Sequence, residues 1–366
     1  MIGHSKPRRT SARPSLPLQG QRRIPLLSLA VVLSLVLLLS AGLLVAGCGS
    51  DSTTTTAAPA TTASTAAPAE TTTTAASGDA TTSTAAQASE GTFPVTITDD
   101  DGVTVTIGAK PVRIVSTKPA STEILFAIGA GDRVVGVSSL DDYPPEAANI
   151  AKVGDFQPNP EAIMGLSPDL VISYSGYEEQ MDPIAAEGAP VITFNPSTVD
   201  GIYANITTLG AATGNTGQAA ALVESLKAEM KKISGAAYAA GSAPKVFYAV
   251  DNTLWTVGPG TFVDDMLKLA NAVNVGAMQG SNGGAQQYYQ FAAEQLIAAD
   301  PDVILLPSTA FKTVEEFTKD ARFSALTAVK DGQVYLVDDT IITRPGPRIA
   351  EGFKALVLAI HPDAGL

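Results

Sequence analysis

The pattern of apolar and polar residues divides the chain into three parts. Residues 24–46 are almost wholly apolar, whereas residues 49–90 carry almost no bulky apolar side chain. From residue 92 onward, short apolar runs typical of buried strands alternate with segments of helical periodicity. Strands and helices in regular alternation predict an α/β fold whose sheets are mainly parallel.

The third part begins with a predicted hairpin, in which two alternating runs flank an Asp-Asp-Gly turn at 100–102. Further strands are predicted at 113–116, 134–137, 170–173, 191–194, 245–250, 303–306 and 334–337. Helices are predicted at 124–128, 262–270 and 349–360.

One stretch of the third part occurs twice. Phe156–Ser173 and Tyr289–Leu306 each run from an aromatic residue through a polar turn to a Glu, then to Pro-Asp and a strand. The matched glutamates, Glu161 and Glu294, are 133 residues apart (294 − 161 = 133). A single long period predicts two copies of a whole lobe. Clefts between domains bind small ligands, so Phe156 and Tyr289 are expected to face each other across one.

A long amphipathic helix is predicted between the two copies, because apolar residues recur every three or four positions over Thr216–Ala239. We therefore predict an N-terminal lobe over residues 92–215, a bridging helix over 216–243 and a C-terminal lobe over 244–366. A helical connector resists bending, so we expect little movement between the lobes.

The N-terminus has the features of an export signal. Six basic residues and no acidic residue precede the apolar run, and the single cysteine, Cys48, directly follows Ala46-Gly47. This order is typical of a secretion signal, and the cysteine matches a bacterial lipoprotein box. We predict a signal peptide over residues 1–47, lipidation of Cys48 and a location on the extracytoplasmic face of the cell membrane. The alternative is a plain transmembrane helix, since the apolar run is just long enough to span a bilayer.

Residues 48–91 are predicted to be a disordered tether. They consist mostly of Thr, Ala, Ser and Pro, and such a composition does not bury enough apolar surface to fold. A flexible tether of this length has a root-mean-square span on the order of 35–40 Å. A folded body on it reaches a membrane complex while staying anchored.

Charge and composition exclude several classes of function. The formal net charge of −13 argues against nucleic acid binding, which needs basic residues to neutralise phosphates. The two histidines, His4 and His361, stand near the chain ends, so an imidazole metal site is not expected. The chain also has no Gly-x-Ser-x-Gly motif and no complete dinucleotide fingerprint. We predict a protein that is not an enzyme and carries no metal or cofactor.

Several short motifs together resemble one family. They are the Thr-Val-Thr-Ile hairpin, Arg113-Ile-Val-Ser116, Thr122–Gly129, Asp132–Val137, Tyr143-Pro-Pro145 and the two Pro-Asp strands. In these the chain resembles the substrate-binding lipoproteins of ABC importers for vitamin B12, ferric siderophores and haem. The resemblance covers residues 92–366. It implies two Rossmann-like lobes, joined by one long rigid helix, with the ligand in the cleft between them.

Within that family the sequence is most similar to vitamin B12-binding members, on the segments Ser139–Ala147 and Arg344–Arg348. The resemblance implies that Arg344 faces the cleft. It also leads one to expect a Trp on the wall of the first lobe, where this chain offers Phe156 and Tyr174. Ferric siderophores favour several basic cleft residues, and few beyond Arg344 and Lys118 are available. A cobalamin-type corrinoid is therefore favoured, while a ferric siderophore or haem stays open.

A large, flat, partly apolar ligand needs aromatic faces and a few polar anchors. The candidates are Tyr143, Phe156, Gln157 and Tyr174 in the first lobe, and Trp255, Tyr288, Tyr289 and Arg344 in the second. Ordinary core packing is the alternative for each aromatic residue. It is less favoured for Trp255, the only Trp, which precedes a Gly-Pro-Gly loop.

The family resemblance also implies one exposed Glu per lobe that docks on arginines of the permease. Glu294 matches this role in the second lobe, and Glu178 or Glu179 in the first, in place of the repeat-equivalent Glu161. A solvated surface is the alternative for each. The expected function is extracytoplasmic capture of the ligand and its delivery to an ABC permease and its ATPase. A lipid-anchored surface interaction module is the alternative from another class.

Overall fold

The computed structural model describes residues 91–278 and 286–366. Contacts divide the chain into two units at Asp79–Ala80, and the described residues all belong to the second unit. The predicted signal peptide, Cys48 and nearly all of the predicted tether lie outside the described residues. In the described part, no helix is both long and apolar enough to cross a membrane.

The described part of the N-terminal lobe is built on a five-stranded parallel sheet in the order β5-β4-β3-β6-β7. Its strands are β3 (Ile114–Ser116), β4 (Val134–Val137), β5 (Ala151–Lys152), β6 (Leu170–Ser173) and β7 (Val191–Thr193). Its helices are α1 (Pro119–Ala127), α2 (Pro160–Gly165), α3 (Glu178–Ala186) and α4 (Val199–Thr213). An antiparallel hairpin, β1 (Val95–Thr98) and β2 (Thr104–Ile107), precedes the sheet. Every residue of β6 is buried, because the sheet is covered on both faces.

The C-terminal lobe repeats this plan in the part that the structure describes, with a four-stranded parallel sheet in the order β10-β8-β12-β13. Its strands are β8 (Lys245–Tyr248), β10 (Val273–Asn274), β12 (Val303–Pro307) and β13 (Val334–Val337). The strands β9 (Trp255–Val257) and β11 (Tyr288–Gln290) form a separate antiparallel pair. Its helices are α6 (Phe262–Leu269), α7 (Ala293–Ala299), α8 (Glu315–Thr318), α9 (Thr327–Lys330), α10 (Asp339–Ile342) and α11 (Ile349–Ile360). The predicted α/β fold class is confirmed.

The sequence repeat corresponds to a structural repeat. Helices α2 and α7 begin 133 residues apart (293 − 160 = 133), and so do strands β6 and β12 (303 − 170 = 133). In each lobe the Pro-Asp carboxylate accepts a hydrogen bond from the main-chain N–H at the start of the central strand. Asp169 accepts from Arg113 at 2.8 Å, and Asp302 accepts from Lys245 at 2.7 Å. The Pro-Asp motif therefore fixes the register of two neighbouring parallel strands in each lobe.

The basic side chains at these two strand starts also have matching roles. The Nε of Arg113 donates to the carbonyl of Leu166 at 2.9 Å, and the Nζ of Lys245 donates to the carbonyl of Ala299 at 2.6 Å. Both carbonyls lie at the C-terminal ends of the repeat helices α2 and α7, where main-chain acceptors lack helical partners. A cation is favourable at this end of a helix, so the charge type is preserved at both positions.

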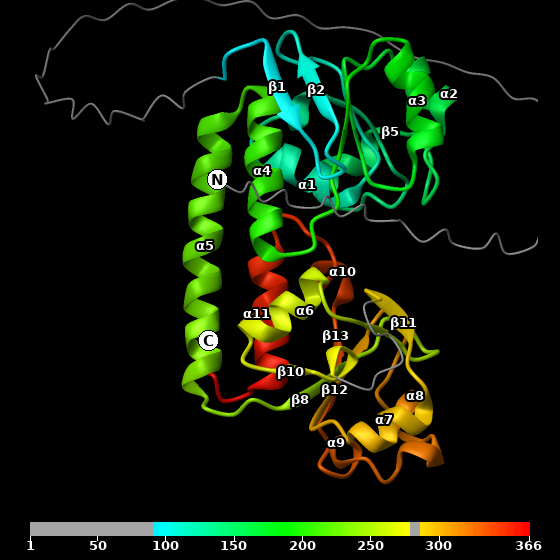
Figure 1. The fold of residues 1–366 in the computed structure, drawn as a ribbon, viewed down its shortest axis with the longest axis vertical. Coiled ribbons are helices and arrows are strands. Elements are labelled where there is room, and N and C mark those ends of the chain that lie inside the picture. Colours follow the sequence, from blue (N-terminus) through cyan, green and yellow to red (C-terminus); the bar gives the residue numbers. More distant parts are fainter. Residues whose placement is uncertain (1–90, 279–285) are drawn as a thin grey trace, which may run out of the picture. The chain divides into compact units, whose positions relative to one another are not determined.

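The connection between the lobes is the helix α5 (Thr216–Ala239), which packs against α4 and α11 (Figure 1). Its buried stripe consists of Ala219, Val223, Leu226, Met230, Ile233 and Ala237. These side chains belong to one apolar cluster that also contains Ile114 of the first sheet and Phe353 of α11. Because one core runs through α5 into both lobes, bending this connector would expose apolar surface.

Candidate ligand-binding site

A cavity of about 520 Å³, here called the larger compartment, is lined by residues of both lobes. Four of its lining residues come within three positions after a strand. Thr117 and Tyr174 directly follow β3 and β6, and Leu140 and Asp339 come shortly after β4 and β13. Open parallel sheets bind ligands beyond the carboxyl ends of their strands. The larger compartment therefore has the position expected of a ligand-binding cleft.

A second cavity of about 170 Å³, here called the smaller compartment, adjoins the larger one. The two share Lys118, Thr343 and Pro345 in their linings. The other lining residues of the smaller compartment are Asn195, Pro196, Ser197, Thr261, Phe262, Gln287 and Tyr288. Amides and hydroxyls predominate there, whereas Pro119, Ala120, Leu140 and Phe156 give the larger compartment apolar walls.

Lys118 stands where the two compartments meet. It is the residue before α1, and its Nζ donates to the carbonyl of Phe194 at 2.9 Å and lies 5.7 Å from the centroid of the Tyr174 ring. Burial lowers the pKa of the Lys118 ammonium to about 8, and the charge of Asp100 opposes part of that shift. At neutral pH Lys118 is mostly protonated and contributes a partly desolvated positive charge to the cleft.

Arg344, predicted as a ligand anchor, lines the larger compartment but is held by two carboxylates. It donates to Glu123 at 3.1 Å and also pairs with Asp142. The Glu123 carboxylate is fully buried and accepts two further hydrogen bonds from Arg348, at 2.9 Å and 2.6 Å. Since both arginines come from the C-terminal lobe, this cluster connects the lobes beside the cleft.

The ion cluster also affects the neighbouring side chains. Hydrogen bonds from Arg344 hold the pKa of Asp142 below its usual range, so Asp142 stays ionised. The guanidinium of Arg348 lies 4.2 Å from the centroid of the Tyr143 ring, which is a cation–π contact. One face of Tyr143 is thus occupied by an arginine of the other lobe.

Four of the predicted ligand-binding residues lie at the two compartments. Phe156, Tyr174 and Arg344 line the larger compartment, and Tyr288 lines the smaller one. The Phe156 side chain is 69% exposed, and the Tyr174 hydroxyl donates to the Phe156 carbonyl at 2.8 Å. An aromatic surface is therefore available to a ligand on the N-terminal side of the cleft.

The prediction that Tyr289 faces Phe156 across the cleft is wrong. Tyr289 is only 5% exposed and packs in a core cluster with Phe247 and Phe291. Its hydroxyl donates to the main-chain carbonyl of Gly276 at 2.7 Å. Side chains of a strand alternate between its two faces, so the inward position of Tyr289 leaves its neighbour Tyr288 exposed.

Three other predicted residues lie outside the linings of both compartments. Gln157 is exposed, and Tyr143 is 42% exposed with Arg348 against one face of its ring. Trp255 is 41% exposed on β9, where it pairs with Gln290 of β11. Contact of these residues with a ligand stays a prediction. Asp142, Asp339 and Thr343 also line the larger compartment and were not among the predicted residues. A signal exists for Asp339, which comes two positions after the predicted strand 334–337.

The predicted docking glutamates are all exposed. Glu178 and Glu179 lie in the first turn of α3, and Glu294 lies in the first turn of α7, as Glu161 does in α2. The main-chain N–H of Gly176 donates to Glu178 and holds its pKa below the usual range. An acidic residue in a first turn also stabilises its own helix. The docking role of these residues stays a prediction.

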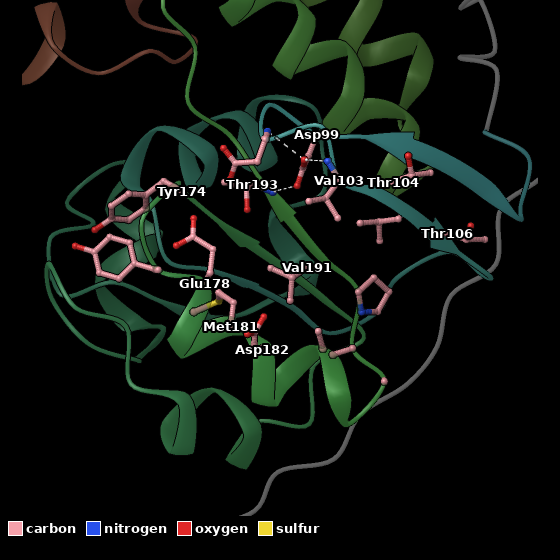
Figure 2. A pocket seen from close by; sticks show the side chains of 17 residues that line it. Asp99, Val103, Thr104, Thr106, Tyr174, Glu178, Met181, Asp182, Val191 and Thr193 are labelled. Atoms are coloured by element: carbon pink, nitrogen blue, oxygen red, sulfur yellow. Dashed lines mark hydrogen bonds between the residues drawn. The ribbon is translucent and has the colours of Figure 1, made fainter. Parts of the chain in front are cut away.

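A groove of about 490 Å³ lies within the N-terminal lobe alone, between the β1–β2 hairpin and α3 (Figure 2). Asp99 anchors its upper end by accepting hydrogen bonds from the main-chain N–H groups of Val103 and Thr193. Met181 and Val191 line its apolar part, and no residue of the C-terminal lobe contributes to it. The groove therefore belongs to one lobe, and Tyr174 lines both the groove and the larger compartment.

The fold and the cleft define a class of protein. Two α/β lobes joined by one long helix, with a cavity beyond the carboxyl ends of both sheets, make a two-lobed ligand-binding protein. The chain belongs to the periplasmic binding protein family, whose model matches residues 114–340. It is an extracytoplasmic substrate-binding component of an ABC importer and not an enzyme, which confirms the predicted family and class.

Individual relatives share most of the chain. It is 36% identical over 289 residues to the uncharacterized ABC transporter substrate-binding lipoprotein YvrC of Bacillus subtilis, covering 76% of this chain and 89% of that protein. It is 30% identical over 286 residues to a cobalamin-binding protein of Halobacterium salinarum, covering 74% and 75% respectively. The structure of the periplasmic heme-binding protein RhuT of Roseiflexus matches with a TM-score of 0.62 and 28% identity, covering 70% of this chain and all of that one.

Proposed function

We propose that this protein captures a cobalamin-type corrinoid between its lobes and delivers it to the membrane permease and ATPase of an ABC importer. The larger compartment supports this proposal most directly. It has apolar and aromatic walls, several polar lining residues and a volume suited to part of a large flat ligand. The cobalamin-binding relative supports the same ligand class.

The residues around the larger compartment favour a corrinoid over haem. Proteins hold haem iron through His, Cys, Met or Tyr. Among the described lining residues of the larger compartment, Tyr174 is the one that belongs to this group. Its hydroxyl is already bonded to the Phe156 carbonyl. A corrinoid keeps its cobalt in its own ring nitrogens and needs no such ligand. Haem is the second candidate because RhuT is a heme-binding protein.

Charge disfavours a strongly anionic ferric siderophore. Two cationic residues, Lys118 and Arg344, and three carboxylates, Asp142, Asp155 and Asp339, line the described larger compartment. Arg344 is already paired with carboxylates. A ligand of high negative charge would meet more repulsion than attraction in this lining.

We place the protein at the cell membrane, held by lipid on Cys48 and by the tether over residues 48–91. The permease is proposed to meet Glu178 or Glu179 on one lobe and Glu294 on the other. Charge pairs of this type fix orientation and speed the encounter more than they add affinity. Replacing Cys48 by Ser and following the protein in membrane and soluble fractions tests the anchor. If the Cys48→Ser variant stays entirely in the membrane fraction, the lipid anchor is contradicted.

Equilibrium binding of the full chain to cyanocobalamin, haemin and a panel of ferric siderophores tests the ligand. Quenching of Trp255, the only tryptophan, and visible spectra report binding. We expect cyanocobalamin to bind most tightly. If none of these ligands binds, the protein is better described as a surface interaction module. The double variant E178R/E294R should abolish corrinoid uptake in cells and leave ligand affinity unchanged, and surviving uptake would show that the docking residues lie elsewhere.

A further inference from the structure

The cleft has two compartments of different chemistry that meet at one cation. The walls of the larger compartment around Phe156 and Leu140 are apolar, whereas the smaller one presents the side chains of Asn195, Ser197 and Gln287. Lys118 lines both. A ligand that fills both therefore needs an apolar body and a polar substituent that passes beside Lys118.

The charge on Lys118 is available to a ligand, in contrast to that on Arg344. Arg344 is paired with Glu123 and Asp142. Lys118 forms no ion pair within residues 91–278 and 286–366, and it donates a hydrogen bond to the uncharged carbonyl of Phe194. An ammonium group has three donor hydrogens, so Phe194 leaves two for other acceptors.

The surroundings of Lys118 strengthen a hydrogen bond from its ammonium group to an anion. Its side chain is half-buried, between the Tyr174 ring and the end of β7. A hydrogen bond between a partly desolvated ammonium and an anion is stronger than one between neutral groups. The Asn195 side chain also lines the smaller compartment, and its amide group can donate to an anionic oxygen. The Thr261 and Thr343 hydroxyls donate to the carbonyls of Gly258 and Asp339.

We propose that the smaller compartment receives an anionic substituent of the ligand and that Lys118 is its specificity-determining residue. The inference rests on the proposed function and deepens it. In a complete corrinoid the anion is the phosphodiester that joins the nucleotide to the ring's side chain. In a porphyrin it is a propionate carboxylate. The volume of about 170 Å³ admits a substituent of this size but not a tetrapyrrole ring.

The test compares ligands that differ in this substituent on the full chain. Dicyanocobinamide has the corrin ring but lacks the phosphodiester and nucleotide, whereas cyanocobalamin has both. We expect wild type to bind cyanocobalamin roughly 10–100-fold more tightly than dicyanocobinamide, the range for one charged hydrogen bond. Lys118→Met should remove most of that difference by weakening cyanocobalamin alone, and Lys118→Arg should restore part of it.

Controls separate this inference from the proposed function. Lys231→Met, at an exposed position on α5, changes the net charge equally and should leave both affinities unchanged. Equal weakening of both corrinoids by Lys118→Met would overturn the inference while the corrinoid function stands. If haemin binds and neither corrinoid does, the assignment of a corrinoid ligand fails. The inference about Lys118 then requires that Lys118→Met weaken the binding of haemin and leave the binding of haemin dimethyl ester unchanged. Binding of none of these ligands would overturn both.

Discussion

Glu123 is predicted to be the residue on which the contact between the lobes depends most. The residue is 1% exposed and accepts hydrogen bonds from Arg348 at 2.9 Å and 2.6 Å and from Arg344 at 3.1 Å. Replacement of Glu123 by Ala removes the carboxylate that both arginines share. Breaking a buried pair by removing one partner is destabilising because the remaining charge has no compensation.

The magnitude follows from the exposure of the two arginines. Removing one partner of a fully buried pair costs about 3–5 kcal/mol. The Arg344 and Arg348 side chains are 17% and 21% exposed, and Arg344 keeps Asp142 as a partner. Both arginines regain some hydration, so we expect the lower limit, about 3 kcal/mol. At roughly 2–4 °C per kcal/mol for a protein of this size, the melting temperature falls by about 6–12 °C.

The assay is denaturant unfolding of the full chain, followed by circular dichroism and by Trp255 fluorescence. Glu123→Gln keeps an acceptor oxygen and should cost about half as much as Glu123→Ala. Glu351→Ala removes an exposed carboxylate near Arg348 and should change stability by less than about 0.5 kcal/mol. A loss below about 1 kcal/mol for Glu123→Ala would refute the reasoning, because it would mean that water already satisfies the arginines.

Three further predictions follow from single side chains. Burial raises the pKa of Asp141 from 3.8 to about 6, so its ionisation opposes folding increasingly between those values and fully above pH 6. Asp141→Asn should therefore stabilise the protein by about 2–3 kcal/mol at pH 8 and hardly at pH 4. Melting curves recorded across this pH range measure the effect, and an equal gain at the two pH values would contradict the prediction. Gly210→Ala would place a Cβ 2.3 Å from that of Ala219 and should lower the melting temperature. Gly235→Ala meets nothing within 4 Å and should raise the melting temperature, because it removes a glycine from a helix. The opposite order of melting temperatures would show that α4 and α5 shift freely. Phe156→Ala should weaken corrinoid binding at least 10-fold in titrations without changing stability, because this side chain is exposed and lies over apolar walls; unchanged affinity would exclude it from the site.

Much of the fold is predictable because it depends on local sequence. The Pro-Asp pairs, the buried strands and the apolar stripe of α5 each specify structure within a few residues. The helix α4 was not predicted, although Thr198 caps it by accepting a hydrogen bond from Gly201 and Gly214 ends it in a left-handed conformation. Its apolar face contains the β-branched residues Ile202 and Ile206, which propensity alone disfavours in helices. Packing against α5 outweighs that propensity.

The position of Tyr289 depends on pairing that the sequence does not reveal. Two tyrosines stand side by side, and only one of them points into the core. Strand β11 pairs with β9 so that Tyr288 lies opposite Val257 and Tyr289 lies opposite Thr256. A shift of one residue would exchange the two tyrosines between the faces of the strand. The choice between them is therefore made by register and not by residue type.

The electrostatics of the cleft depend on contacts between distant segments. Arg344 and Glu123 are 221 residues apart, and no local pattern pairs them. An Arg beside a Pro-Gly-Pro loop invites the interpretation of a free ligand anchor, but the structure gives Arg344 two carboxylate partners. Displacing Glu123 from Arg344 to accommodate an anion would take a partner away from a fully buried carboxylate, which is costly. Within the described residues, Lys118 has no carboxylate partner to lose. An anionic group that enters the cleft is therefore stabilised more by contact with the lysine than by displacing Glu123 or Asp142 from the arginine.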